Sequence, residues 1–289
     1  MATRSSRPSG NGAGAKARQA GDQAQQAGSQ VQQHPAYHIL VTVGLICFGI
    51  IHLLLGWLCI QIALGGGGEA STDGALKNLV SQPLGNVLMI VFAIGLFALA
   101  IWQLLEALFG YGNREKKKMI RKKISSAGRT IMYSAIGFSA LMLALGSDTG
   151  DSEESAQSTT ATLMDMPFGR ILVGIVGLVV IGVGVAHVVK GVRRKFAEDD
   201  LESGAPEWGK KLGMVGWTVK GVSIGLVGAL FAWAAITYDA EKAGGTDGAL
   251  KTLQDQPFGQ ILLIAMGLGF AAFGLYCFVW SRNVNHENI

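Results

Sequence analysis

The residues best placed for chemistry in this chain are ionisable and polar groups that interrupt long apolar stretches. His52 falls at the midpoint of the first stretch, and two i, i+3 pairs, Gln103/Glu106 and His187/Lys190, lie near the ends of later ones. The i, i+3 spacing puts the members of each pair on one helix face. Hydrocarbon makes such groups costly, so they face protein or water and serve as proton relays, solute sites or interhelical hydrogen bonds. We expect a neutral His52 bonded to a neighbouring helix, with proton relay or solute binding as the sharper alternative.

Motifs for nucleophilic, zinc or nucleotide chemistry are absent from the sequence, which lacks G-x-S-x-G, H-E-x-x-H and G-x-x-x-x-G-K-[ST]. His34 and His38 have the spacing of two ligands on a helix, but Pro35 intervenes and no third ligand is near. Cys47 and Cys59 would stand about 18 Å apart on one helix, too far for a disulfide. We therefore expect no catalytic residues, no metal, no cofactor and no enzymatic activity.

Six apolar blocks must position these groups. The chain has 289 residues, a mean hydropathy of +0.36 and 15% charged residues, unlike an ordinary soluble domain. Each block is near the length that crosses a bilayer as a helix. The third is the shortest, and its alternative is to lie at an interface. The blocks are 38–64, 84–109, 129–146, 168–190, 212–237 and 258–280.

An internal repeat organises the blocks. Residues 72–85 read "TDGALKNLVSQPLG", residues 246–259 read "TDGALKTLQDQPFG", and 159–169 hold a worn third copy, "TTATLMDMPFG". Each copy joins an odd block to an even one and ends in Pro-x-Gly. The proline favours extended backbone before it and the first turn of a helix after it, and the glycine lets the chain pass close to a neighbour. These structural corners are Pro83 with Gly85, Pro167 with Gly169, and Pro257 with Gly259.

Each outer loop should also carry a short helix. Asp73 and Asp247 are candidate caps, and the leucines that follow them recur at i, i+3. Such a helix would lie on the outer membrane surface with its leucines toward lipid.

The odd blocks superpose as well, through "GIIHLLLG" (49–56), "TIMYSAIG" (130–137) and "GVSIGLVG" (221–228). The sequence thus predicts an all-α membrane protein of six transmembrane helices, arranged as three parallel-repeat hairpins with pseudo-threefold symmetry about the membrane normal. Counted from each proline, Glu106 and Lys190 occupy the same position, so we hypothesise a charge pair; in the rival interpretation Lys190 snorkels to the interface. The expected units are a disordered tail 1–37, hairpins 38–109, 129–190 and 212–280, cytoplasmic loops 110–128 and 191–211, and a tail 281–289.

Basic residues predict the orientation. Loops 110–128 and 191–211 hold seven and five lysines and arginines, whereas the three outer loops hold one, none and two. By the positive-inside rule both termini face the cytoplasm. The run from Lys116 to Lys123 either anchors this topology or also recognises anionic lipid. We expect the lipid bilayer as partner, together with a membrane protein or a second copy of the chain, and no nucleic acid.

Three copies of a two-span unit, with "GAL…L…QPFG" in the outer loop and "W…EA" near the end of the second span, resemble a bacterial membrane-protein family known as domain of unknown function twelve-oh-six. The resemblance covers residues 38–282. The middle repeat departs from it by lacking "DGAL", and His52 stands where such proteins carry a tyrosine, as Tyr133 does here. The resemblance implies a fold and no established activity.

Two functional hypotheses follow. The preferred one is a non-catalytic assembly or scaffold component of the cytoplasmic membrane, because the spans contain few polar groups for a coupled transporter. The alternative is a channel or transporter for an ion or small solute. An enzyme acting on lipid is the weakest, since no paired catalytic groups are visible. A continuous polar cavity would favour passage, and a dry, glycine-packed centre would favour assembly.

Overall fold

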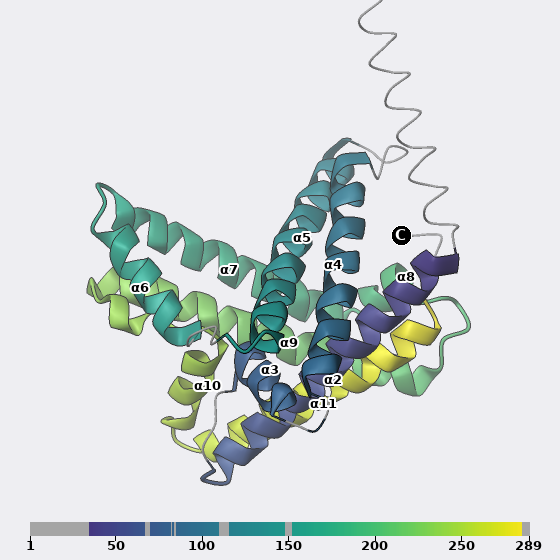
Figure 1. Ribbon diagram of the computed structural model, residues 1–289. Helices are drawn as coiled ribbons and strands as arrows, with labels where there is room; N and C mark the ends of the chain where they lie inside the picture. The colour runs from purple at the N-terminus through teal and green to yellow at the C-terminus, as the bar shows by residue number, and fades with distance from the viewer. Residues whose placement is uncertain are drawn as a thin grey trace, which may run out of the picture.

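The computed structural model describes residues 35–66, 70–81, 83, 85–109, 116–147 and 152–284, and these are almost entirely helical, with one isolated β-bridge (Figure 1). Residues 1–34 of the expected disordered tail, with His34, and the last five residues lie outside them, whereas residues 35–37 of that tail are the first residues of a helix. The six long helices are α2 (Pro35–Ala63), α4 (Gly85–Phe109), α5 (Lys116–Ala144), α7 (Gly169–Val192), α9 (Glu207–Thr237) and α11 (Gly259–Arg282). The shorter ones are α3 (Thr72–Val80), α6 (Ser152–Met164), α8 (Lys195–Asp200), η1 (Ala240–Lys242) and α10 (Thr246–Gln254).

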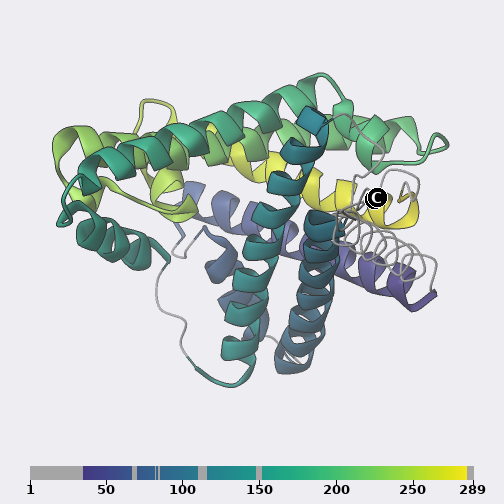
Figure 2. The same cartoon turned by 90° about the horizontal axis from the view of Figure 1, so that it is seen from above.

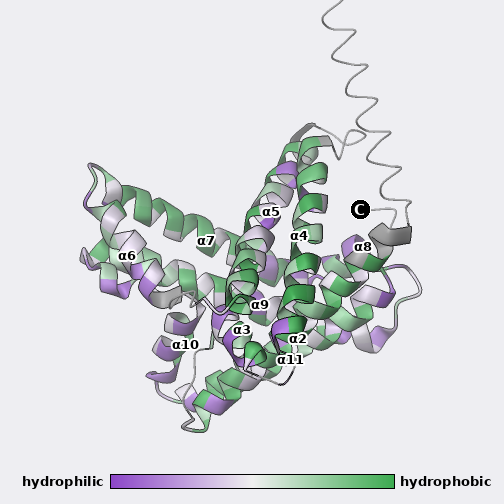
Figure 3. Cartoon of the chain, in the orientation of Figure 1, coloured by the Kyte–Doolittle hydropathy of each residue, from purple (hydrophilic) through white to green (hydrophobic). Residues whose placement is uncertain are grey.

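Within this part of the chain, five of the long helices are long and apolar enough to cross a membrane. The other is α5, whose first turns carry the basic run. Figure 3 shows that the long helices other than α5 are hydrophobic along most of their length, and that polar residues gather on α5, on the short helices and at helix ends. The predicted fold class, an all-α membrane protein built from repeats, is confirmed.

α5 begins earlier than expected. It starts at Lys116, so residues 116–128, expected as a loop, are helical. Lysine, arginine and alanine are good helix formers, and the segment has no proline, so the helix continues past the apolar block. α9 similarly starts at Glu207, directly after Pro206, although its apolar block begins at residue 212.

The closest helix pairs join one repeat to the next. α4 packs along α5, α7 along α9, and α11 along α2 (Figures 1 and 2). The second span of each repeat therefore pairs with the first span of the following repeat, and the third repeat closes back on the first. Within a repeat the two spans diverge more, and the three pairs cross one another steeply. This closure agrees with the predicted pseudo-threefold order, but the sequence did not indicate that the tightest pairs cross repeat boundaries.

Facing glycines hold α2 against α11. A Cβ added to Gly49 would lie 2.8 Å from the carbonyl oxygen of Gly274, and one on Gly267 would lie 2.7 Å from that of Gly56. Both helices place these glycines seven residues apart, which is two helical turns on the same face. Small residues allow helix backbones in a membrane to approach this closely.

α7 and α9 repeat the same arrangement. Gly184 faces Gly221, and Gly177 faces Gly228; a Cβ added to any of the four would meet the facing carbonyl oxygen at 2.7 to 2.9 Å. Gly184 lies against both Gly221 and Gly225: a Cβ on Gly184 would lie 2.6 Å from the backbone nitrogen of Gly225, whereas a Cβ on Gly225 itself would enter open space.

The three Pro-x-Gly corners are built in the same way. The prolines are exposed and the glycines that follow two residues later are buried. A Cβ on Gly169 or Gly259 would collide with backbone carbonyls at the end of the preceding short helix. Phe168 and Phe258, between proline and glycine, take left-handed φ values of 65° and 66°. The close approach expected of the glycines is thus made to the chain's own outer helix.

The outer helices differ from expectation in two respects. The side chain of Ser71 caps α3 by accepting from the N–H of Gly74 at 2.9 Å, and α10 has no side-chain cap, so the aspartates are not the caps. The leucines do not face lipid. Leu76 and Leu250 are 0% and 1% exposed and belong to the protein core, because the outer helices lie against the bundle.

Candidate functional site

Side chains of α7 and α9 converge on Trp217, which is 9% exposed. The Nζ atoms of Lys190 and Lys220 lie 4.1 Å and 5.8 Å from its ring centroid. The His187 ring lies 5.3 Å from it, and His187 Nδ1 donates to the Val183 carbonyl at 2.8 Å. The glycine-mediated pairing of α7 with α9 brings the predicted His187/Lys190 stripe onto this ring. We call Trp217, His187, Lys190, Lys220 and Asp200 the Trp217 cluster.

Lys190 forms an ion pair with Asp200. Its Nζ donates to both carboxylate oxygens, at 2.8 Å and 3.1 Å, and the two side chains are 22% and 12% exposed. The sequence proposed Glu106 as the partner. The side chain of Glu106 lies outside the described residues, and the carboxylate that the structure places on Lys190 comes from α8. Burial raises the pKa of Asp200, with the positive charges of Lys190 and Arg129 opposing the rise.

Asp200 reaches the cluster because the expected cytoplasmic loop 191–211 folds back onto the bundle. Phe196 is fully buried and packs edge-on against Tyr276 at 5.2 Å. The N–H of Glu202 donates to the carbonyl of Asn283 at 2.9 Å, beside an isolated bridge from Leu201 to Val284. Sequence reasoning had treated this segment only as a basic connection.

The ammonium group of Lys220 on α9 is enclosed by aromatic side chains. Its Nζ lies 4.4 Å and 4.5 Å from the ring centroids of Phe273 and Phe48, so that rings from α2, α9 and α11 surround the ammonium. Such cation–π contacts stabilise a desolvated cation. In the repeat register Lys220 corresponds to Phe48, which is buried, and to Arg129, whose side chain is exposed.

His52 is 7% exposed and lies near the same rings. Its Nδ1–H donates to the carbonyl of Phe48, 2.8 Å away, and its ring packs 4.4 Å from Phe48 and 4.6 Å from Phe273. The expected hydrogen bond to a neighbouring helix is instead made one turn back on its own helix. Lys220 and His52 thus share two aromatic neighbours.

Gln103 lies on α4 and is 1% exposed, and its Oε1 has no hydrogen-bond partner among the described residues. No contact places it in the Trp217 cluster. In the parts of the chain that the structure describes, no three His, Cys, Asp or Glu side chains are grouped to hold a metal ion. Cys47, Cys59 and Cys277 are free thiols.

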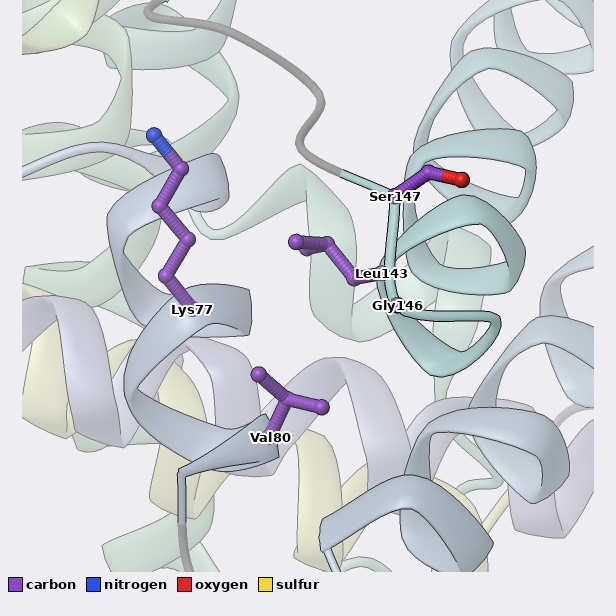
Figure 4. A pocket seen from close by; sticks show the side chains of 5 residues that line it. All are labelled: Lys77, Val80, Leu143, Gly146 and Ser147. Carbon is purple, nitrogen blue, oxygen red and sulfur yellow. The ribbon is translucent and has the colours of Figure 1, made fainter.

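A depression of about 360 Å³ lies between α3 and the end of α5 (Figure 4). Lys77, Val80, Leu143, Gly146 and Ser147 line it, and Figure 4 shows the Leu143 side chain pointing from the end of α5 toward α3. It contains none of the site residues predicted from sequence, and the polar groups around it suggest no catalytic arrangement.

Six long helices, five of them apolar enough to cross a membrane, together with three repeated corners and a basic–aromatic cluster between helices, define a multi-pass membrane protein. Residues 43–110, 124–194 and 215–283 each match the family described as Domain of Unknown Function (DUF1206), and the chain belongs to this family. It is 30% identical over 241 residues to "Uncharacterized protein YxxB" of Bacillus subtilis (strain 168). The aligned region covers 81% of this chain and 86% of that protein. No solved structure matches the chain.

Proposed function

We propose that the protein is a non-catalytic assembly component of the bacterial cytoplasmic membrane, with both termini in the cytoplasm. The observation that carries the proposal is the dense aromatic packing where the helix pairs meet. Phe48 lies 6.0 Å from both Tyr133 and Phe273, and Trp217 lies 5.4 Å from Phe273, all edge-on.

These four rings come from α2, α5, α9 and α11, so one aromatic layer joins the three repeats. Edge-to-face ring pairs stabilise beyond the area that they bury. A solute following the axis would have to displace the rings, and the glycine pairs keep the surrounding helices close. This centre suits a rigid platform better than a route for solutes.

Purification from native membranes in a mild detergent, followed by native mass spectrometry, tests the proposal. We expect a stoichiometric complex, either with a membrane-protein partner or with a second copy of the chain. Proteoliposomes should show no more ion flux than protein-free liposomes. A monomer that conducts ions would contradict the proposal.

Passage of an ion or small solute is the second candidate. The observation that favours it is the presence of two basic groups, Lys220 and His52, against the same two inner rings. The discriminating variant is His52→Tyr, which places in the first repeat the residue that Tyr133 supplies in the second. Flux present in the parent protein and lost in this variant would support passage over assembly.

Anionic lipid is the proposed partner of the basic run from Lys116 to Lys123. Lys123, at its end, donates through Nζ to the carbonyl of Leu108 at 2.8 Å and so ties α5 to the last turn of α4. A juxtamembrane basic segment attracts the anionic cytoplasmic leaflet. Replacing Lys117 and Lys118 by glutamine should lower binding to phosphatidylglycerol vesicles relative to phosphatidylcholine vesicles.

A further inference from the structure

The Trp217 cluster and its surroundings hold more positive than negative charge. Lys190 is matched by Asp200. Lys220 has three aromatic neighbours and no carboxylate within ion-pair distance in the described part of the chain. Arg129 on α5 lies within electrostatic range of Lys220, His187 and Asp200. A cation in low-dielectric surroundings is costly without a counter-charge, so this imbalance indicates a missing anion.

Two buried hydrogen-bond donors in the Trp217 cluster and its surroundings lack an acceptor at ordinary distance. The indole N–H of Trp217 has only a long, weak contact with the Tyr276 hydroxyl and makes no hydrogen bond of ordinary length to any described residue. The fully buried hydroxyl of Tyr276, which lies beside Trp217 and Asp200, makes none of ordinary length within the same residues. Buried donors without acceptors cost free energy, and an oxyanion with several oxygens could accept from them and from an ammonium together.

The cluster is at the depth of a lipid headgroup region. Lys220 precedes the outer end of α9, Thr237, by 17 residues, or roughly 25 Å of helix. In a hydrocarbon core about 30 Å thick, it therefore lies near the cytoplasmic boundary. Long basic side chains at this depth extend to the interface. The exposed Arg129 side chain lies on α5, which packs on α4 rather than on α7, so the cluster can be approached from the side of the second repeat.

We propose that Lys220, Arg129 and the indole N–H of Trp217 form a binding site for a phosphate-type oxyanion at the cytoplasmic boundary of the bundle. The aromatic rings hold the Lys220 ammonium in place, and the Lys190–Asp200 pair closes one side. The site is separate from the basic run at the start of α5. The oxyanion comes either from the headgroup of an anionic phospholipid or from a free phosphate in the cytoplasm.

Ligand-induced stabilisation of the full chain in detergent tests the site. One titration compares phosphatidylglycerol with phosphatidylcholine, and the other compares inorganic phosphate with chloride at equal ionic strength. The variants are Lys220→Met and Arg129→Met, with Lys211→Met as the matched control, since Lys211 is an exposed lysine on the same helix. A fourth variant, with Lys117 and Lys118 changed to Gln, reports lipid bound at the basic run.

We expect the anion to raise the melting temperature of the parent protein. Lys220→Met and Arg129→Met should each weaken its apparent affinity about tenfold, as expected for one lost charge-assisted hydrogen bond. Lys211→Met should match the parent. A response to phosphatidylglycerol alone identifies a lipid headgroup, and a response to inorganic phosphate as well identifies a soluble ion.

Two outcomes would overturn the proposal. In the first, the parent protein responds to neither anion beyond its neutral or chloride control. In the second, folded Lys220→Met and Arg129→Met proteins respond as the parent does. If Lys220→Met does not fold, the response of Arg129→Met to the anion tests the proposal, because the exposed Arg129 side chain contributes little to packing.

Discussion

The carboxylate of Asp247 accepts a hydrogen bond of 2.7 Å from the backbone N–H of Ala70, 177 residues earlier in the chain. Both residues are fully buried, and Lys251 Nζ lies 2.6 Å from the other carboxylate oxygen. The contact joins the outer loop of the third repeat to that of the first. It closes the ring of repeats on the outer side, as the α11–α2 pair closes it within the bundle.

Removing this carboxylate should destabilise the fold. Asp247→Ala leaves the Ala70 N–H buried without an acceptor, and we expect a loss of about 1–3 kcal/mol in the free energy of unfolding. Asp247→Asn keeps an acceptor oxygen and should lose less. Thermal unfolding in detergent measures both, with Asp255→Asn as an exposed control at the end of the same helix. Equal melting temperatures for parent and Asp247→Ala would contradict the role assigned to this contact.

Two glycines one turn apart on α9 should respond differently to alanine. Gly221→Ala places a methyl group 2.7 Å from the carbonyl oxygen of Gly184, so the helices must separate, at a cost of about 1–3 kcal/mol. Gly225→Ala places one in open space and should be neutral or stabilise by up to about 1 kcal/mol through helix propensity. The measurement is the melting temperature in one detergent. Similar losses in the two variants would refute glycine-mediated packing of α7 on α9.

The Lys190–Asp200 pair should appear as coupling in a double-mutant cycle. Lys190→Met leaves the largely buried Asp200 carboxylate without its cation, which should cost about 2–3 kcal/mol at this partial exposure. Asp200→Asn also removes a carboxylate that burial disfavours, so it should cost less. The double variant should lose less than the sum, by about 1 kcal/mol. Additive losses would exclude an energetically coupled pair.

The burial of Asp200 should also make the stability of the fold depend on pH. Burial raises the pKa of its carboxyl in the folded protein. At pH values between the ordinary carboxyl pKa and the raised one, the folded chain therefore binds the proton more tightly than the unfolded chain does. The stability from this group is complete below the ordinary carboxyl pKa and is lost as pH rises through the raised one. Asp200→Asn should remove that downward slope from a plot of melting temperature against pH, and the exposed Glu207→Gln control should retain it. An unchanged slope in Asp200→Asn would exclude the assignment.

The proposed orientation can be measured by thiol labelling of intact cells. In a background without the native cysteines, Glu154→Cys on α6 should react with a membrane-impermeant reagent and Lys195→Cys on α8 should not. Both side chains are exposed, so accessibility within the protein is matched. Labelling of Lys195→Cys alone would reverse the topology.

Local structure was predictable because it follows from short-range physics. Apolar blocks of bilayer length indicated the long helices, since a chain in hydrocarbon must satisfy its own backbone hydrogen bonds. The recurring Pro-x-Gly corners indicated where α4, α7 and α11 begin, because proline and glycine restrict or permit specific backbone angles. The site residues His52, His187 and Lys190 could likewise be selected from sequence as polar groups in apolar surroundings.

The partners of those residues were decided only by the tertiary structure. Counting along the chain suggested Glu106 as the partner of Lys190, and the structure shows that the segment after α7 folds back and supplies Asp200, which the sequence did not indicate. The three aromatic neighbours of Lys220 come from two other helices and from one turn back on its own helix, so the sequence alone did not indicate them. Periodicity determines which face of a helix is apolar or small. Which helix covers that face depends on how three similar repeats close into a ring, and this closure is a property of the packed chain as a whole.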